Sequence, residues 1–177
     1  MRTLKPLFVL IFLAVLTSGY SQKVYTENDI KVIPKPTQLL INKGVFEFSK
    51  STKFIAITDF QKQISNALIS NFEKAGGFRP ELSTAFPNTN YLQFKVDETL
   101  EKEAYILDVN SKFITITAKG QAGFIYALES IRQLLPVVIE SKNVIAKQKW
   151  QIPNLLVNDK PRFQWRGLML DLSRHFF

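Results

Sequence analysis

The sequence contains no cysteine and a single histidine, His175, among its 177 residues. The missing cysteines exclude disulfides, thiolate metal sites and a cysteine nucleophile. A lone histidine cannot complete a zinc site without cysteine or a second imidazole. No glycine-rich phosphate loop is present either, because Gly76 and Gly77 lack a third spaced glycine. We therefore predict no metal and no cofactor, and a chain held together by packing alone.

Long apolar runs are also scarce. The unbroken run Leu7 to Leu16 follows Arg2 and Lys5 and precedes small and polar residues, an order typical of a secretory signal peptide. Crossing a membrane takes about 20 apolar residues. The run is too short for that, although a membrane anchor is the alternative interpretation. We predict that residues 1–21 are a signal peptide, that no membrane span follows it, and that the protein is exported to the periplasm or the cell exterior.

Runs of like charge are absent, although the formal net charge is +8. Without Arg2 and Lys5, 21 basic residues remain against 15 acidic ones, a formal +6. The lysines occur singly, with no basic helix face interleaved with aromatic residues. This pattern predicts a solvated surface and no nucleic-acid binding.

The residues that are present alternate between strand and helix patterns. Turn-forming residues and short apolar runs between residues 32 and 57 predict three short strands. From Asp59, apolar spacings of three and four predict a helix that Thr58 or Asp59 caps and that Gly76-Gly77 ends. A second helix is expected from Gly120 to Pro136. Period-two alternation predicts the remaining strands at 91–97, 104–110 and 112–120, with a last one near 152–157.

This order of elements predicts an α+β fold in which helices cover one face of a mixed or antiparallel sheet. The unit spans residues 22–160. The stretch "PRFQWRGLMLDLSRHFF" that follows, residues 161–177, opens like a loop and becomes an apolar strand followed by polar groups. It is expected to begin a second unit.

Four stretches resemble family 20 of the glycoside hydrolases, the β-N-acetylhexosaminidases. They are "VIPKP", "EAYILDV", "ITITAKGQAGFIYALESIRQLLP" and "IPNLLVNDKPRFQWRGLMLDLSRHFF", in the family's order, and the resemblance covers residues 32–177. It implies that residues 22–160 are the family's amino-terminal α+β domain and that residues 161–177 begin an incomplete catalytic (β/α)8 barrel. A complete barrel takes roughly 250 residues.

The resemblance also implies the chemistry, which is retaining hydrolysis of terminal N-acetylhexosamine residues assisted by the substrate's acetamido group. The family uses an adjacent Asp-Glu pair in the barrel for this reaction. The only Asp-Glu dipeptide here, Asp97-Glu98, precedes the barrel and does not match that motif, so it is interpreted as a solvated turn. We predict no catalytic residue within these 177 residues.

One binding residue carries over from the family. Arg166, in "WRG", matches an arginine that holds the sugar hydroxyls, and a guanidinium with five fixed donors suits that task. The alternative is an arginine that satisfies carbonyls or a carboxylate. Asp171, Arg174 and His175 are expected to form a supporting hydrogen-bonded network at the end of the first barrel strand.

The two tryptophans, Trp150 and Trp165, could each stack on a sugar ring. For Trp165, burial at the domain junction is the preferred interpretation.

Taken together, the sequence predicts the amino-terminal part of an exported β-N-acetylhexosaminidase that acts on glycans containing N-acetylhexosamine. The chain on its own is expected to be inactive. The competing hypothesis is an exported, non-catalytic module that binds glycans or a protein through its sheet face.

Overall fold

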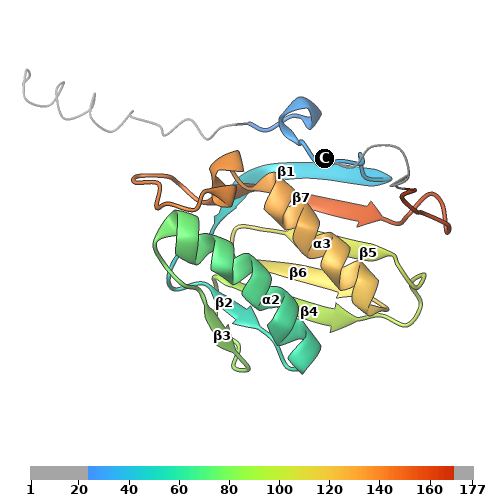
Figure 1. The fold of residues 1–177 in the computed structure, drawn as a ribbon, viewed down its shortest axis with the longest axis horizontal. Coiled ribbons are helices and arrows are strands. Elements are labelled where there is room, and N and C mark those ends of the chain that lie inside the picture. Colours follow the sequence, from blue (N-terminus) through green and yellow to red (C-terminus); the bar gives the residue numbers. More distant parts are fainter. Residues whose placement is uncertain (1–23, 170–177) are drawn as a thin grey trace, which may run out of the picture.

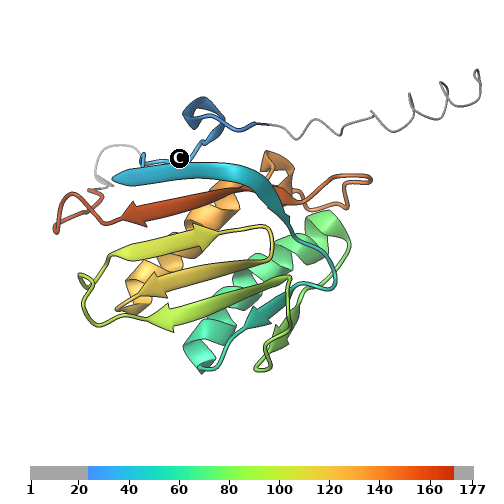
Figure 2. The same cartoon turned by 180° about the vertical axis from the view of Figure 1, so that it is seen from behind.

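The structure is a computed structural model that describes residues 24–169. Seven strands form one mixed sheet, and two helices lie side by side on one of its faces (Figures 1 and 2). The strands, in spatial order, are β1 (Gln38–Glu47), β7 (Gln151–Asp159), β5 (Tyr105–Val109), β6 (Phe113–Ala118), β4 (Tyr91–Val96), β2 (Lys53–Ile55) and β3 (Glu81–Ser83). The helices are α2 (Asp59–Asn71) and α3 (Gln121–Leu134), with short turns η1 (Glu27–Asp29), η2 (Phe72–Gly76) and η3 (Val137–Glu140).

The sheet is mixed because its two halves pair differently. β1, β7, β5 and β6 pair antiparallel, whereas β6, β4, β2 and β3 pair parallel. The predicted fold class, α+β with helices on one face, is confirmed for this domain.

The central strands follow the predicted period of two. Ile114 and Ile116 are fully buried under the helices, whereas Thr115 and Thr117 lie on the opposite face and are half-buried. The hairpin between β5 and β6 turns at Asn110, whose side-chain oxygen accepts hydrogen bonds from the backbone of Lys112 and Phe113 at 2.9 and 3.1 Å. We call the face without helices the open face.

Helix α2 begins where the sequence predicts, and although α2 itself ends at Asn71, the helical run continues through the π-helical η2 to the predicted end at Gly76. Thr58 is the N-cap, and its side chain accepts a hydrogen bond from the Gln61 backbone at 3.2 Å, while the Gln61 side chain returns to the Thr58 backbone. This reciprocal pair satisfies donors that a helix start leaves open. At the other end, Gly77 has a φ of +69°, a conformation that glycine adopts without strain.

Helix α3 packs closely on the sheet through Gly123. A Cβ at this position would lie 2.4 Å from the backbone oxygen of Ala104, so a larger residue cannot fit without a shift. The predicted apolar stripe of Phe124, Leu128, Ile131 and Leu135 is buried. Glycine here therefore sets how near the helix lies to β5.

Aromatic rings fill the core between β1 and α2. Phe48 contacts Phe46, Phe54 and Phe72, with ring centroids 5.0, 6.4 and 4.8 Å apart. Trp150 meets the edge of Phe72 at 6.1 Å and is only 4% exposed. Trp150 is a core residue, and the prediction that it might stack on a sugar is wrong.

One strand prediction is wrong, one strand was missed and one prediction is not confirmed. Residues 32–57 form two strands instead of three, since β1 is one strand of ten residues that continues through an irregularity between Ile41 and Val45. β3 was not predicted, because three residues are too few to show alternation. The predicted barrel strand is not confirmed, because residues 160–169 contain no helix or strand and residues 170–177 lie outside the described part.

No helix within residues 24–169 is long and apolar enough to cross a membrane. The predicted signal peptide, residues 1–21, lies outside the described residues and stays a prediction.

Candidate functional site

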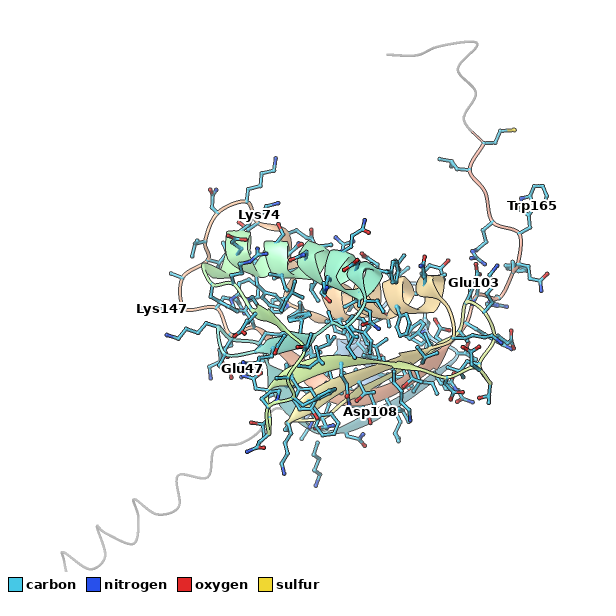
Figure 3. All side chains as sticks on the ribbon, turned by 90° about the horizontal axis from the view of Figure 1, so that it is seen from below. Glu47, Lys74, Glu103, Asp108, Lys147 and Trp165 are labelled. Atoms are coloured by element: carbon cyan, nitrogen blue, oxygen red, sulfur yellow. The ribbon has the colours of Figure 1, made fainter. Side chains whose placement is uncertain are left out.

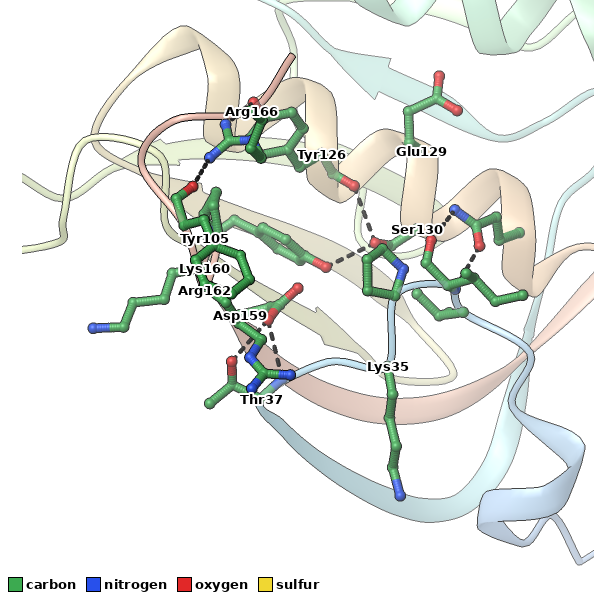
Figure 4. Close-up of a pocket in the computed structure, with 16 residues that line it drawn as sticks. Lys35, Thr37, Tyr105, Tyr126, Glu129, Ser130, Asp159, Lys160, Arg162 and Arg166 are labelled. Carbon is green, nitrogen blue, oxygen red and sulfur yellow. Dashed lines mark hydrogen bonds between the residues drawn. The ribbon is translucent and has the colours of Figure 1, made fainter. Parts of the chain in front are cut away.

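A pocket of about 760 Å³ lies beside α3 (Figure 4). Its walls come from α3, from the segment before β1 and from the residues that follow β7. They are Val32, Ile33, Pro34, Lys35, Thr37, Tyr105, Tyr126, Glu129, Ser130, Gln133, Asp159, Lys160, Pro161, Arg162, Phe163 and Arg166. A volume of this size is common among small-molecule sites.

Arg166 lies at one rim of the pocket, where three groups accept its hydrogen bonds. Its guanidinium contacts the Glu103 carboxylate at 2.7 Å, the Tyr126 hydroxyl at 3.2 Å and the carbonyl of Phe163. The hydrogen bond to Glu103 raises the pKa of Arg166. Among residues 24–169, Arg166 therefore satisfies a carboxylate and a carbonyl, as the alternative interpretation expected, and its role in sugar binding stays a prediction.

A tyrosine and a serine lie in the interior wall of the pocket. The Tyr105 hydroxyl lies 2.7 Å from Ser130 Oγ, which donates to the Tyr126 carbonyl one helical turn earlier at 3.0 Å. Because the Ser130 hydroxyl donates its hydrogen to that carbonyl, the Tyr105 hydroxyl is the donor in its hydrogen bond with Ser130. Burial raises the pKa of Tyr105 to about 12, and nearby Asp159 acts in the same direction. Tyr105 therefore stays protonated at ordinary pH.

Two polar clamps hold the segment before β1 against this wall. The Asp159 carboxylate accepts from the backbone and hydroxyl of Thr37 at 3.0 and 2.9 Å. Gln133 accepts from the Ile33 backbone N–H at 2.7 Å and donates to the Ile33 carbonyl at 3.3 Å. These contacts join residues about 100 positions apart, and they build the pocket wall from the "VIPKP" stretch.

The charges around the pocket do not form a hydrolytic centre. Asp159 accepts hydrogen bonds from Thr37, and Glu129 accepts one from Arg132 at 2.8 Å. Neither carboxylate therefore faces a second carboxylate as a free general acid would. Arg162 lies 6.0 Å from the centroid of the Phe163 ring. Residues 24–169 contain no cluster of three or more potential metal ligands. Among the described residues, the pocket offers no nucleophile paired with a base.

The other predicted site residues are dispersed. Asp171, Arg174 and His175 lie outside the described residues. Asp97 and Glu98 form a turn after β4, where Asp97 accepts from Thr99, and this hydrogen bond lowers the pKa of Asp97. Trp165 is 89% exposed among the described residues, and its expected burial at the domain junction stays a prediction.

Sequence reasoning did not find the residues that build the pocket. Ser130 follows Tyr126 by one helical turn, and a serine on the buried stripe of a helix is a weak sign of a buried polar contact. The pairings of Asp159 with Thr37 and of Gln133 with Ile33 leave no sequence signal, because they join distant parts of the chain.

The comparison with protein families is decisive. The model described as "Glycosyl hydrolase family 20, domain 2" matches residues 29–160, which are the sheet, both helices and the segment before β1. The chain belongs to glycosyl hydrolase family 20. The recognised resemblance is confirmed.

Curated relatives in this family are hexosaminidases. The chain is 28% identical over 153 residues to a β-hexosaminidase of Porphyromonas gingivalis, a match that covers 85% of this chain and 20% of the relative. A β-hexosaminidase of Akkermansia muciniphila is 41% identical over 78 residues, covering 44% of this chain and 14% of the relative.

Solved structures agree. The β-N-acetylhexosaminidase of Streptomyces coelicolor A3(2) aligns with a TM-score of 0.75 at 26% identity, over 84% of this chain and 30% of that one. An exo-β-N-acetylglucosaminidase of Vibrio harveyi, solved with N-acetylglucosamine, aligns with a TM-score of 0.68 at 27% identity, over 84% and 22%. The chain thus spans less than a third of the length of these relatives.

Proposed function

We propose that this chain is the amino-terminal part of an exported β-N-acetylhexosaminidase that removes terminal N-acetylhexosamine residues from glycans. The observation that carries the proposal is the family match over residues 29–160, together with hexosaminidase relatives that are several times longer than the match. In this proposal the α+β domain precedes the catalytic domain in the chain.

We also propose that these 177 residues on their own have no hydrolase activity. Protonating a glycosidic oxygen requires a placed acid, and substrate-assisted hydrolysis requires a second carboxylate beside the acetamido group. The Asp97-Glu98 dipeptide is an exposed turn on the domain surface, and the pocket carboxylates are engaged by Thr37 and Arg132. Neither set supports acid catalysis.

Arg166 is the residue proposed to contact substrate. A guanidinium offers five donors, and in this structure three acceptors occupy two of its three nitrogens. Sugar binding by Arg166 would replace Glu103 and Tyr126 with sugar hydroxyls. Arg166 can exchange these partners because its ion pair with Glu103 is exposed to solvent, with side-chain exposures of 42% for Arg166 and 36% for Glu103.

The test begins with the DNA that follows the codon for Phe177, read on an independently amplified template. The proposal expects barrel strands and an adjacent Asp-Glu pair in the continued reading frame. The continued product should hydrolyse 4-nitrophenyl N-acetyl-β-glucosaminide. In that product, Arg166→Lys should lower kcat/KM by on the order of tenfold or more, because lysine cannot reproduce the fork of donors. A stop followed by unrelated sequence would overturn the enzyme proposal.

Export has its own test. The proposal expects a secreted or periplasmic product that begins near residue 22. Mass spectrometry of the amino terminus after expression checks this, and a cytoplasmic product that still carries Met1 to Ser21 would contradict export.

A further inference from the structure

Seven exposed lysines gather at one end of the domain. They come from β1, from three turns and from the long connection between η3 and β7, and they are Lys43, Lys50, Lys74, Lys112, Lys142, Lys147 and Lys149. We call this group the basic end. In Figure 3, Lys74 and Lys147 mark this end, opposite Glu103 and Trp165.

Hydrogen bonds between the turns bring these isolated lysines together. Asn154 donates both to the Lys43 carbonyl and to Ser111 Oγ, at 2.8 Å each, and so joins β1 to the turn that carries Lys112. Asn90 donates through its backbone to the Lys112 carbonyl and through its side chain to Ser49 and Ser51, which flank Lys50.

Two further backbone bonds attach the remaining lysines. Phe48 donates to the Trp150 carbonyl at 2.8 Å, which places the segment with Lys147 and Lys149 beside the Lys50 turn. Ile145 donates to the Ala75 carbonyl at 2.8 Å, which places the same segment beside Lys74. The scattered lysines of the sequence therefore become one basic surface only in the fold.

The positive charges of the basic end are not neutralised by ion pairs with the described carboxylates. None of its seven lysines forms an ion pair with a carboxylate of residues 24–169. Three carboxylates at this end are already paired with other cations, Glu73 with Arg79, Glu81 with Lys53 and Glu140 with Arg132. A fourth carboxylate, Glu47, also lies at this end (Figure 3) and accepts a hydrogen bond from Gln151 at 2.7 Å, so the lysines remain in excess. Acidic side chains concentrate instead in the loop after β4, residues 97–103. The domain thus presents a positive surface to an anionic partner.

Aromatic rings accompany these charges. Tyr91 and Phe113 are neighbours on β4 and β6, with parallel rings 5.3 Å apart, and Phe86 meets Tyr91 edge-on at 5.8 Å. Both strand residues point to the open face, since their neighbours Leu92 and Ile114 are buried beneath the helices. Phe86 is 58% exposed and offers an apolar surface on which a sugar ring can pack.

We propose that the basic end and the adjoining aromatic cluster bind an anionic glycan, in which acidic sugars alternate with neutral N-acetylhexosamine. Lys112 and Lys50 precede strands two places apart in the sheet, about 10 Å. Phosphates in a nucleic-acid strand are spaced far more closely, roughly 3.4 Å apart along the helix axis. Sparse lysines suit a polymer with an anion on every second sugar.

The two parts of this proposal have different foundations. Anion binding depends on the charges described above. The N-acetylhexosamine component rests on the proposed function of the chain. Neither part requires hydrolysis, so a binding test separates failure of this proposal from failure of the enzymatic one.

The experiment measures binding of the purified chain to a fluorescent hyaluronan oligosaccharide, in which glucuronate alternates with N-acetylglucosamine. The test variant is Lys50→Gln, Lys112→Gln and Lys147→Gln combined. The matched control is Lys31→Gln, Lys95→Gln and Lys102→Gln, which removes the same charge from exposed lysines elsewhere on the domain that also lack a carboxylate partner among the described residues. Circular dichroism should show that both variants remain folded.

Binding should weaken by on the order of tenfold or more in the test variant and by less than about twofold in the control, and added salt should weaken it further. Equal losses in the two variants would overturn the site, because net charge alone would then explain binding. No binding by the unaltered chain would overturn it as well.

Further probes decide between glycans and other partners. Phe86→Ala should weaken hyaluronan binding severalfold, whereas Ile125→Ala, at an exposed apolar side chain on α3, should leave it unchanged. Single-stranded DNA of equal charge, or vesicles containing phosphatidylserine, should bind more weakly than hyaluronan. Tighter binding to either would replace the glycan with a nucleic acid or a membrane, and equal binding of an uncharged chitin oligosaccharide would remove the role of the lysines.

Discussion

The sheet-and-helix body and the segment after it differ in how they treat large apolar side chains. In residues 38–159, the core side chains Phe54, Leu107 and Ile116 are fully buried. In residues 160–169, Trp165, Leu168 and Met169 are 89%, 93% and 94% exposed. The body buries a large apolar core, although Ile57 and Phe86 on its surface are 66% and 58% exposed, whereas none of the described residues covers Trp165, Leu168 or Met169. We therefore expect the stability of the described residues to depend on the core of the body and little on residues 160–169.

The largest expected effect is the loss of stability when a buried side chain of the body is truncated and leaves a cavity. Ile116→Ala should lower the free energy of unfolding by about 2–5 kcal/mol, because it removes a fully buried side chain from β6. Leu168→Ala, at a 93% exposed position, should change it by less than about 0.5 kcal/mol. Urea denaturation followed by circular dichroism measures both. Similar losses at the two positions would break the comparison.

Glycines offer a second contrast, with a smaller expected effect. Gly123→Ala should cost about 1–3 kcal/mol, since the new methyl would meet the Ala104 backbone oxygen at 2.4 Å. For Gly167→Ala the new methyl would lie 3.6 Å from Trp165 and near no other described residue, so the change should be nearly neutral. If thermal unfolding shows Gly123→Ala to be as stable as the parent, α3 does not depend on this close approach to β5.

Tyr105, in the body, makes the stability of the fold depend on pH. Tyr105→Phe should cost about 1 kcal/mol by removing the hydrogen bond to Ser130. The pKa of Tyr105 is raised to about 12, so the folded state keeps a proton that the unfolded chain releases near pH 10. The stabilisation is complete below pH 10 and is lost as the pH rises toward 12.

The phenylalanine variant supplies the control for this titration. Its stability should fall less steeply between pH 10 and 12 than that of the parent, as followed by urea denaturation at each pH. Identical slopes would show that Tyr105 does not titrate in this range.

The smallest effect is expected at the junction of the two regions. Glu103→Gln removes the carboxylate partner of Arg166, but the pair is exposed and screened by water. The melting temperature should stay the same within error. Glu101→Gln, which removes the exposed partner of Lys160, is the matched control. A clear loss of stability in Glu103→Gln alone would mean that residues 160–169 are anchored to the body.

Sequence reasoning recovered the parts of the fold that repeat locally. The alternation of Ile114 and Ile116, the capping by Thr58 and the apolar stripe of α3 each carry a signal within a few residues. The irregularity in β1 depends on Asn154, more than 100 residues away, and β3 is too short for any period. These features result from tertiary contacts, which a local pattern does not contain.

The candidate sites show the same division. Arg166 was found through a local motif, but its contacts with Glu103 and Tyr126 join it to residues 63 and 40 positions away. The lysines of the basic end were single and unremarkable in sequence, and only the sheet order brings them together. For Trp150 the error was the opposite. The residue type suggested a sugar-stacking site, but the side chain lies in the core against Phe72.

The most direct test of the central claim is the release of nitrophenol from 4-nitrophenyl N-acetyl-β-glucosaminide by the purified chain, measured beside the product of the reading frame continued past Phe177. The account predicts a folded chain with no turnover above buffer, and turnover by the continued product. Turnover by the chain itself that is lost in Arg166→Ala would contradict the account, because the catalytic groups would then lie within these 177 residues.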